Sequence, residues 1–213
     1  MTKQPIEFFF DPVSPFSYLA TTRINPLAQK YGRTVMWRPT LVGITVVKIM
    51  GLKPVPETPM KSVYSWLDAQ RQAEMLGVPL RKHGHAKVNS LAASRAYLWL
   101  KERDEAKAQL LVANLSARLW ADGINITDPD VVVAAAQDLG VDTTDLVTAL
   151  GRDQLKQKLK DAFDYALSRN VFGVPYFIVD EQPLWGVDRL WLLEHWLKNG
   201  SWPRLFGPSV TIP

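Results

Sequence analysis

The stretch IEFFFDPVSPFSYLA, residues 6–20, carries the chain from an apolar run into the start of a helix. Its first part, IEFFF (6–10), is rich in β-forming residues and almost continuously apolar, which is typical of a strand buried on both faces. Ser14 is suited to cap the N-terminus of a helix, and Pro15 is suited to the first helical position. The stretch therefore predicts a buried strand that turns into a helix at a serine.

The residues after this turn extend the pattern. The helix is expected to run toward LAQKYG (27–32), with a kink or local adjustment at Pro26 and an end at Gly32. TVMWRP (34–39) is the second predicted strand. A strand, a helix and a strand in this order favour a parallel strand pair.

The middle of the chain is predicted to be helical. GLKPVPETP (51–59) is rich in proline, and we expect an irregular excursion there. Helical periodicity with start and stop signals then marks a series of segments: 60–77, 90–104, 105–123, 128–140, 142–150 and 153–170.

β-character returns near the end of the sequence. VFGVPYFIVD (171–180) and LWGV (184–187) are predicted strands joined by a turn at EQP, and 188–200 is a last amphipathic helix. An α/β half at each end with helices between them is the arrangement of split thioredoxin-like folds. We therefore predict an α/β protein whose thioredoxin-like domain, residues 1–45 and 168–213, is split by a large all-helical insertion, residues 46–167.

Composition limits the chemistry. The 213 residues include no cysteine, which excludes a disulfide scaffold, a thiolate metal site and a redox cycle of the protein's own thiols. The net charge is +4, without a long basic run, so the sequence favours no nucleic-acid partner and fits a mild attraction for anionic small molecules. The N-terminal segment is interrupted too early for a signal peptide, and no apolar stretch is long enough for a membrane span. We expect a cytoplasmic protein without a membrane partner.

Two later stretches complete a candidate site. GVP (173–175) puts a proline at the start of a β-run, and in thioredoxin-like folds this proline is cis and its predecessor offers backbone groups to an extended peptide. Alone, GVP also fits a simple prolyl turn before a strand. In LWGVDRL (184–190), Asp188 is suited to cap the final helix, and the amides of 185–187 are suited to bind an anion. The plain alternative is that Asp188 only caps the helix.

The chain resembles the family of 2-hydroxychromene-2-carboxylate isomerases and kappa-class glutathione transferases, which are related to bacterial disulfide oxidases. The resemblance runs from Glu7 to about Leu197 and is carried by five stretches: FFFDPVSPFSYL, VKIMG, WADGINITD, VFGVPYFIVD and LWGVDRLWLLE. Its specific part is the motif series S-P-[FY]-S-[WY], F-G-V-P and W-G-x-D-R in this order. Proteins of this family bind glutathione, so the resemblance implies that the thiol comes from the cofactor.

The resemblance implies which residues hold glutathione. Ser14, at the head of a helix, would donate a hydrogen bond to the sulfur and favour the thiolate. Val174 would bond the cysteinyl backbone, and Asp188 would take the ammonium group of the γ-glutamyl end. The other residues implied at that end are Trp185, Gly186 and Val187. Lys61 would reach the glycyl carboxylate, with surface placement as the equal alternative, and Ser17 is interpreted as structural.

The resemblance also implies the substrate side. Lys48 and Ile49, in VKI, would lie against the substrate, since a cation suits a carboxylate, and Asn89 would line the same pocket. Without the resemblance, Lys48 is simply a surface lysine. The sequence departs from the family pattern at Val187, where Ser or Asn is usual, and in the 51–59 loop.

Other residues are interpreted as structural. His83 and His85 lack carboxylate neighbours, so we predict no metal site. We predict a core role for four of the tryptophans: Trp99, Trp120, Trp191 and Trp196.

The implied function is a glutathione-dependent isomerase that converts 2-hydroxychromene-2-carboxylate to trans-o-hydroxybenzylidenepyruvate by reversible thiolate addition, in aromatic hydrocarbon catabolism. It implies glutathione as cofactor, a small aromatic carboxylate as substrate, and a homodimer. Two alternatives stay open. One is a kappa-class-like glutathione transferase using the same site on electrophilic substrates. The other is a non-catalytic thioredoxin-like protein that binds glutathione or a peptide.

Overall fold

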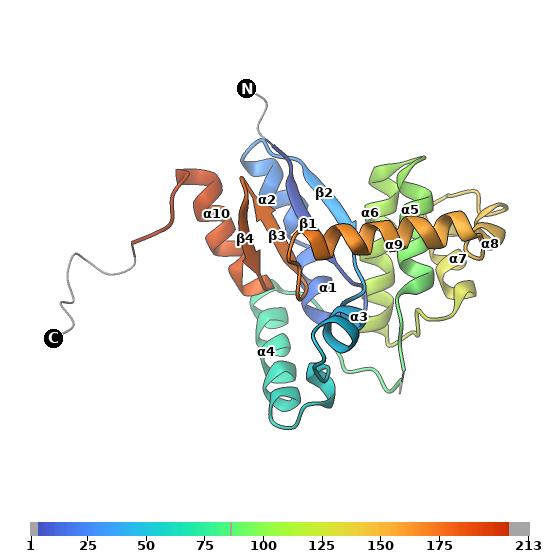
Figure 1. Ribbon diagram of the computed structural model, residues 1–213, viewed down its shortest axis with the longest axis horizontal. Helices are drawn as coiled ribbons and strands as arrows, with labels where there is room; N and C mark the ends of the chain where they lie inside the picture. The colour runs from blue at the N-terminus through green and yellow to red at the C-terminus, as the bar shows by residue number, and fades with distance from the viewer. Residues whose placement is uncertain (1–3, 86, 205–213) are drawn as a thin grey trace.

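The computed structural model describes residues 4–85 and 87–204, and its strands form one mixed four-stranded sheet with the order β2-β1-β3-β4 (Figure 1). β1 (Ile6–Phe10) pairs in parallel with β2 (Val35–Pro39), as predicted. On its other side β1 pairs antiparallel with β3 (Tyr176–Val179), which in turn pairs antiparallel with β4 (Gln182–Trp185). The first and last parts of the chain therefore build one sheet, as the predicted split fold requires.

Most of the remaining described chain is helical. The helices of the two end segments have these bounds: α1 (Pro15–Thr21), α2 (Ile24–Lys30), the short 3-10 helix η4 (Val187–Arg189) and α10 (Leu190–Asn199). The helices between β2 and β3 are α3 (Val42–Ile44), the π-helix η1 (Thr45–Ile49), the 3-10 helix η2 (Val55–Glu57), α4 (Lys61–Leu76), α5 (Leu91–Lys101), α6 (Glu105–Ala117), the π-helix η3 (Arg118–Asp122), α7 (Pro129–Gln137), α8 (Leu146–Ala149) and α9 (Asp153–Ser168). Within the described ranges, no helix has the length and apolar character that a membrane crossing requires.

Both faces of β1 are buried, which confirms the interpretation of IEFFF. Ile6, Phe8 and Phe10 belong to the main core, which also holds side chains of α1, α2, α5, α6 and α10. Phe9 faces the opposite way and packs in a second cluster with Ala166 near the end of α9. The sheet is therefore covered on one face by several helices and on the other by α9, which crosses it in Figure 1.

The first helix differs from the prediction of one helix adjusted at Pro26. The chain forms α1 and α2 with a break at residues 22–23, where the hydroxyl and amide of Thr22 both bond to the carbonyl of Leu19. Pro26 therefore falls in the first turn of α2, where its missing N–H costs no intrahelical hydrogen bond. Gly32 follows α2 with a φ of +64°, as expected for a helix end.

The turn of the hairpin between β3 and β4 is shorter than predicted. Val179 pairs with Gln182, so the turn consists of Asp180 and Glu181 and not of EQP. These two residues have φ values of +47° and +62°, which correspond to a two-residue hairpin turn that usually contains glycine. Pro183 consequently lies inside β4, opposite Ile178 on β3.

A buried hydrogen bond fastens the insertion to the sheet. The hydroxyl of Tyr97 on α5 donates to the carbonyl of Trp37 on β2 at 2.8 Å, and both residues are buried. The Tyr97 ring also meets the Phe10 ring edge-on, with centroids 5.3 Å apart. The side chain of Tyr97 thus joins α5 to two neighbouring strands.

We expect Tyr97→Phe to lower the free energy of unfolding by about 1 kcal/mol, because a buried hydrogen bond is lost while the ring stays. Denaturant-induced unfolding followed by circular dichroism measures the change. Tyr64→Phe is the matched control, since Tyr64 is 64% exposed, and its effect should stay below about 0.5 kcal/mol. Equal effects of the two changes would contradict the assignment.

Candidate active site

Ser14 lies at the turn after β1, as predicted. Its side-chain oxygen accepts the backbone N–H of Ser17 at 3.2 Å and so caps α1, with Pro15 at the first helical position. Ser14 is half-buried. No acceptor for its hydroxyl hydrogen is found among the described residues, so the hydroxyl can accept from α1 and still donate to a ligand.

The peptide bond between Val174 and Pro175 is cis, as the thioredoxin-like prediction required. Val174 is buried, with 8% of its surface exposed. In the antiparallel pair, Phe9 lies opposite Tyr176. The residues just before β3 and the turn just after β1 therefore lie at the same end of the sheet, which brings Val174 beside the Ser14 turn.

Residues 185–188, at and just after the end of β4, lie at the same end of the sheet. The amide of Gly186 donates to the carbonyl of Pro175 at 2.9 Å, and η4 contacts α1. The indole of Trp185 lies over Gly173, where an added Cβ would be 2.7 Å from the indole Nε1. Trp185 is 54% exposed, so its indole forms part of the surface near Val174.

Asp188 does not cap the last helix, which corrects the prediction. The N-cap position of α10 is Arg189, with no side-chain cap, and Gly186 occupies the N-cap position of the preceding η4 with a φ of +108°. The Asp188 carboxylate forms an ion pair with Arg189 at 2.8 Å and is partly exposed. The amide of Gly186 is already bonded to Pro175, so it is not one of the free amides that the anion-site interpretation needed. Val187 is buried in the main core.

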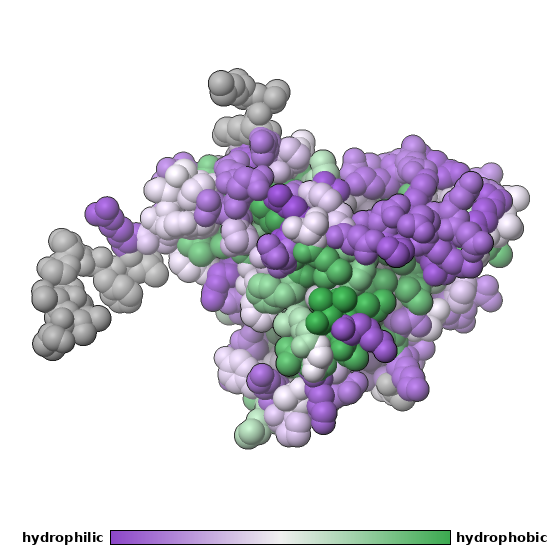
Figure 2. Space-filling model, viewed as in Figure 1, coloured by the Kyte–Doolittle hydropathy of each residue, from purple (hydrophilic) through white to green (hydrophobic). Residues whose placement is uncertain are grey.

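Lys48 and Ile49, the predicted substrate residues, both lie in the π-helix η1 and are exposed. π-helical turns are rare and frequently occur at functional sites. The apolar residues exposed along this segment are Ile44, Val47, Ile49, Met50 and Leu52. Figure 2 shows apolar surface gathered where Figure 1 places α3 and the segment after it. Lys48 is therefore a cation on an apolar surface.

Lys61 and Asn89 lie elsewhere on the insertion. Lys61 is exposed at the first position of α4, a helix that contacts α1. The side-chain oxygen of Asn89 accepts the amide of Leu91 at 3.1 Å, so this side chain already helps to begin α5. Contacts of Lys61 and Asn89 with ligands stay predictions.

Asp11 is a site residue that the sequence interpretation missed. It is 2% exposed and lies three residues before Ser14 in the same turn. Its carboxylate oxygens accept the amides of Val13 at 3.2 Å and of Val42 at 2.9 Å. Burial raises the pKa of Asp11, although hydrogen bonds from the Ser90 side chain and from these two amides act to lower it. A carboxylate directly after a buried apolar strand was the available signal.

Trp120 touches the same turn. Its indole N–H donates to the carbonyl of Pro12 at 3.2 Å, and the ring lies 4.8 Å from that of His83. Trp120 and Trp99 are buried, as predicted for core residues, and Trp196 is partly buried. Trp191 is 50% exposed, so its predicted core role was wrong: it lies on the outer side of α10.

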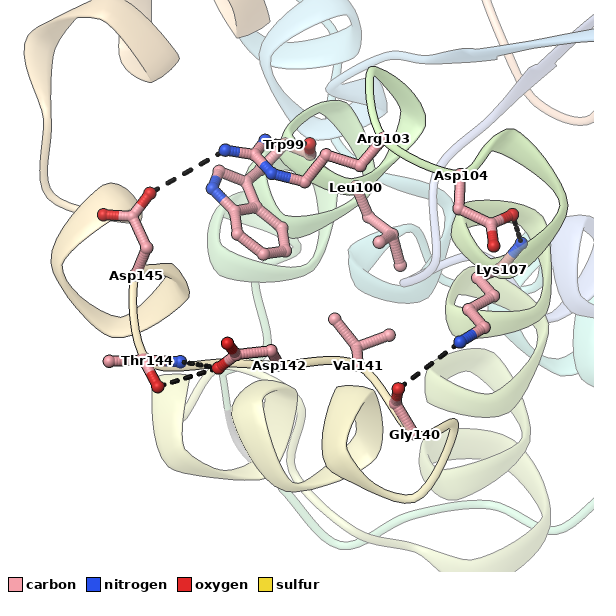
Figure 3. A pocket seen from close by; sticks show the side chains of 10 residues that line it. All are labelled: Trp99, Leu100, Arg103, Asp104, Lys107, Gly140, Val141, Asp142, Thr144 and Asp145. Carbon is pink, nitrogen blue, oxygen red and sulfur yellow. Dashed lines mark hydrogen bonds and ion pairs between the residues drawn. The ribbon is translucent and has the colours of Figure 1, made fainter.

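The described residues contain no group of three or more His, Cys, Asp or Glu side chains that could hold a metal ion. The rings of His83 and His85 stack on each other with centroids 5.5 Å apart. A cavity of about 490 Å³ lies elsewhere in the insertion, between Trp99 of α5, Arg103 just after that helix, Lys107 of α6 and Asp145 (Figure 3). None of the predicted glutathione or substrate residues lines it, so it is separate from the Ser14 site.

Comparisons with known proteins agree with this geometry. The family model for the DsbA-like thioredoxin domain matches residues 5–198. The 2-hydroxychromene-2-carboxylate isomerase of Sphingobium xenophagum is 34% identical over 205 residues, which cover 93% of this chain and all of that protein. The human glutathione S-transferase kappa 1 is 26% identical, over 96% of this chain and 95% of its own.

One solved structure has a similar fold over nearly the whole length of both chains. The structure of a selenomethionine 2-hydroxychromene-2-carboxylate isomerase has a TM-score of 0.82 and 29% sequence identity, covering 92% of this chain and 95% of its own. The four strands of the sheet, the Ser14 turn and the cis Val174–Pro175 bond all lie within the residues that the family model matches. The chain therefore belongs to the DsbA-like thioredoxin family, among the relatives of 2-hydroxychromene-2-carboxylate isomerases and kappa-class glutathione transferases.

Proposed function

We propose that the chain is a glutathione-dependent isomerase that converts 2-hydroxychromene-2-carboxylate to trans-o-hydroxybenzylidenepyruvate in aromatic hydrocarbon catabolism. The observation that carries the proposal is the free donor of the half-buried Ser14 hydroxyl, beside the cis Val174–Pro175 bond, in a chain without cysteine. Relatives named as this isomerase, at 30% and 34% identity over most of the chain, support the reaction.

The chemistry of these groups fits glutathione. Ser14 offers a hydroxyl donor for a thiol, the cis bond at Val174 lies just before β3 at the end of the sheet where Ser14 lies, and Asp188 offers a partly exposed carboxylate for an ammonium group. When bound, glutathione supplies the thiol that adds reversibly to the substrate. Val187, where the family usually has Ser or Asn, retains only its backbone groups for this purpose.

Each residue then has a separate task. A free thiol has a pKa of about 8.5, so little thiolate exists at neutral pH, and a hydrogen bond from Ser14 to the sulfur favours the charged form. Lys48 attracts the substrate carboxylate, because a charge-assisted contact is stronger than a neutral one. The apolar residues around Lys48 are available to pack against an aromatic ring.

We expect bound glutathione to have a thiol pKa lower by about one unit or more than free glutathione, and Ser14→Ala to lose that shift together with most of the isomerase activity. One unit corresponds to about 1.4 kcal/mol, which a hydrogen bond to a charged group can supply. Ultraviolet difference spectra at the thiolate band, recorded across pH, measure it.

Ser116→Ala is the control for Ser14→Ala. Ser116 is a buried serine on α6 whose hydroxyl has no hydrogen-bond partner among the described residues, so its loss should leave the thiol pKa unchanged. Binding of glutathione by the wild-type chain with an unshifted thiol pKa would contradict the enzyme and favour a binding protein.

The second candidate is a glutathione transferase, which the kappa-class relatives favour. The two reactions differ in stoichiometry, since a transferase consumes one glutathione per product and an isomerase returns it unchanged. We expect the total free thiol to stay constant while the 2-hydroxychromene-2-carboxylate spectrum changes, as thiol titration and product chromatography would measure. A loss of thiol equal to the product formed would identify the transferase.

We expect Lys48→Met to raise the KM for the carboxylate substrate about tenfold, because the lost interaction is a hydrogen bond to a charged group, while glutathione affinity stays unchanged. Steady-state kinetics at constant glutathione measure the effect. Lys53→Met is the control, because Lys53 is an exposed lysine in the neighbouring loop. Similar KM values for both variants would assign the effect to general electrostatics.

The remaining parts of the proposal concern partners. We propose a small aromatic carboxylate as substrate, a second copy of the chain as the protein partner, and the cytoplasm as the location. The absence of cysteine is compatible with the cytoplasm, and the net charge of +4 without a long basic run gives no support for a nucleic-acid partner. Sedimentation velocity would test the dimer, and a single monomeric species at micromolar concentration would refute it.

A further inference from the structure

The turn that carries Ser14 is held, through Asp11, by segments that follow β2. One carboxylate oxygen accepts the amide of Val13 inside the turn, at 3.2 Å, and the other accepts the amide of Val42 at the start of α3, at 2.9 Å. The Ser90 side chain, just before α5, also bonds to this carboxylate. One buried group therefore links the turn to two separate segments that follow β2.

A second contact holds the same turn independently. The indole N–H of Trp120, in the π-helix η3, donates to the carbonyl of Pro12 at 3.2 Å. Trp120 is 8% exposed, and its ring lies against those of Trp66 and His83, with centroids 6.4 and 4.8 Å away. The rings around it restrict the direction of the N–H, so Pro12 is held from the side of η3.

The stability of the fold does not explain a carboxylate at position 11. Asp11 is almost fully buried, and its hydrogen-bond partners among the described residues are neutral amides and a hydroxyl, without a basic side chain. A buried charge that lacks a charged partner costs free energy compared with a neutral group of the same shape. Burial raises the pKa of Asp11, which agrees with such a cost. A function of the turn is the better explanation.

We propose that Asp11 and Trp120 are positioning residues that fix the turn of residues 11–14 against the insertion and so direct the Ser14 hydroxyl toward the glutathione sulfur. This inference rests on the proposed function of Ser14. The amide of Ser14 donates to the carbonyl of Asp11 at 2.9 Å, so the backbone on which the hydroxyl is mounted is itself tied to Asp11. A shift of Asp11 or Pro12 therefore moves Ser14 directly.

The test compares Asp11→Asn and Trp120→Phe with the wild-type full-length chain. Asn keeps the size of the side chain but can accept only at one atom, so one of the two amide bonds is lost. Phe keeps an aromatic ring but removes the N–H donor together with part of the ring that packs against Trp66 and His83. Thermal unfolding, calorimetric glutathione binding, the thiol pKa of bound glutathione and the kcat and KM of isomerisation are measured for each.

For both variants we expect glutathione to bind within about threefold of wild type, since Val174 and residues 185–188 are untouched. We expect the thiol pKa to rise by about one unit, and the thiolate fraction and kcat to fall about tenfold with it. Ser116→Ala is the control: Ser116 is buried, its hydroxyl has no partner among the described residues, and it lies on α6 outside the turn. It should change neither the thiol pKa nor kcat.

The outcomes separate this inference from the proposed function. If the wild-type chain does not lower the thiol pKa, the function proposed for Ser14 fails. If the wild type lowers it and folded variants retain both the shift and kcat, losing only thermal stability, the positioning role of Asp11 and Trp120 is overturned. If Asp11→Asn does not fold, the measurements on Trp120→Phe decide, because this change removes the hydrogen bond to Pro12 and leaves the buried Asp11 carboxylate in place.

Discussion

The antiparallel pairing of β1 with β3 is the constraint on which the site depends. β1 comes from the start of the chain and β3 from its last part, yet Phe9 lies opposite Tyr176. This register brings the turn after β1 and the cis Val174–Pro175 bond before β3 to one end of the sheet. The bond from Gly186 to Pro175 then adds the end of β4. The turn after β1, the residues before β3 and the residues after β4 thus meet at one end of the sheet because β1 pairs with β3 and β3 pairs with β4.

The helices of the insertion contact the Ser14 turn at this end of the sheet and also contribute to the core. Tyr97 ties α5 to β2 through a carbonyl, and Trp120 ties η3 to the Ser14 turn through another. Both contacts use a ring that is held by packing and a single donor that is aimed at the backbone. Val42 and Asp11 add a bond in the opposite sense, from a backbone amide to a side chain. The helices between the two halves therefore fix the position of the turn and do not only cover the sheet.

Local signals in the sequence predicted the elements whose causes are local. IEFFF was identifiable as a doubly buried strand because phenylalanine occurs at neighbouring positions, and Ser14 with Pro15 marked the start of α1. The Asp180–Glu181 turn was missed because neither residue is a glycine, although both adopt positive φ values.

The contacts that complete the site were not predictable in this way. Asp188 lies inside the short helix η4, which begins after Gly186, and the position of Gly186 is set by its bond to Pro175 in the pairing of β3 with β4; the N-cap position of α10 is Arg189. The partners of Asp11 include Val42 and Ser90, which the fold brings together and sequence spacing cannot reveal.

An open sheet also has two outer edges, and β4 forms one of them. The amide of Gly186 points toward β3, so alternation along β4 turns position 183 outward, where Pro183 has no N–H to offer. A strand from another chain that approached this edge would find a donor missing, so the edge strand β4 is protected against sheet extension and aggregation by a single proline.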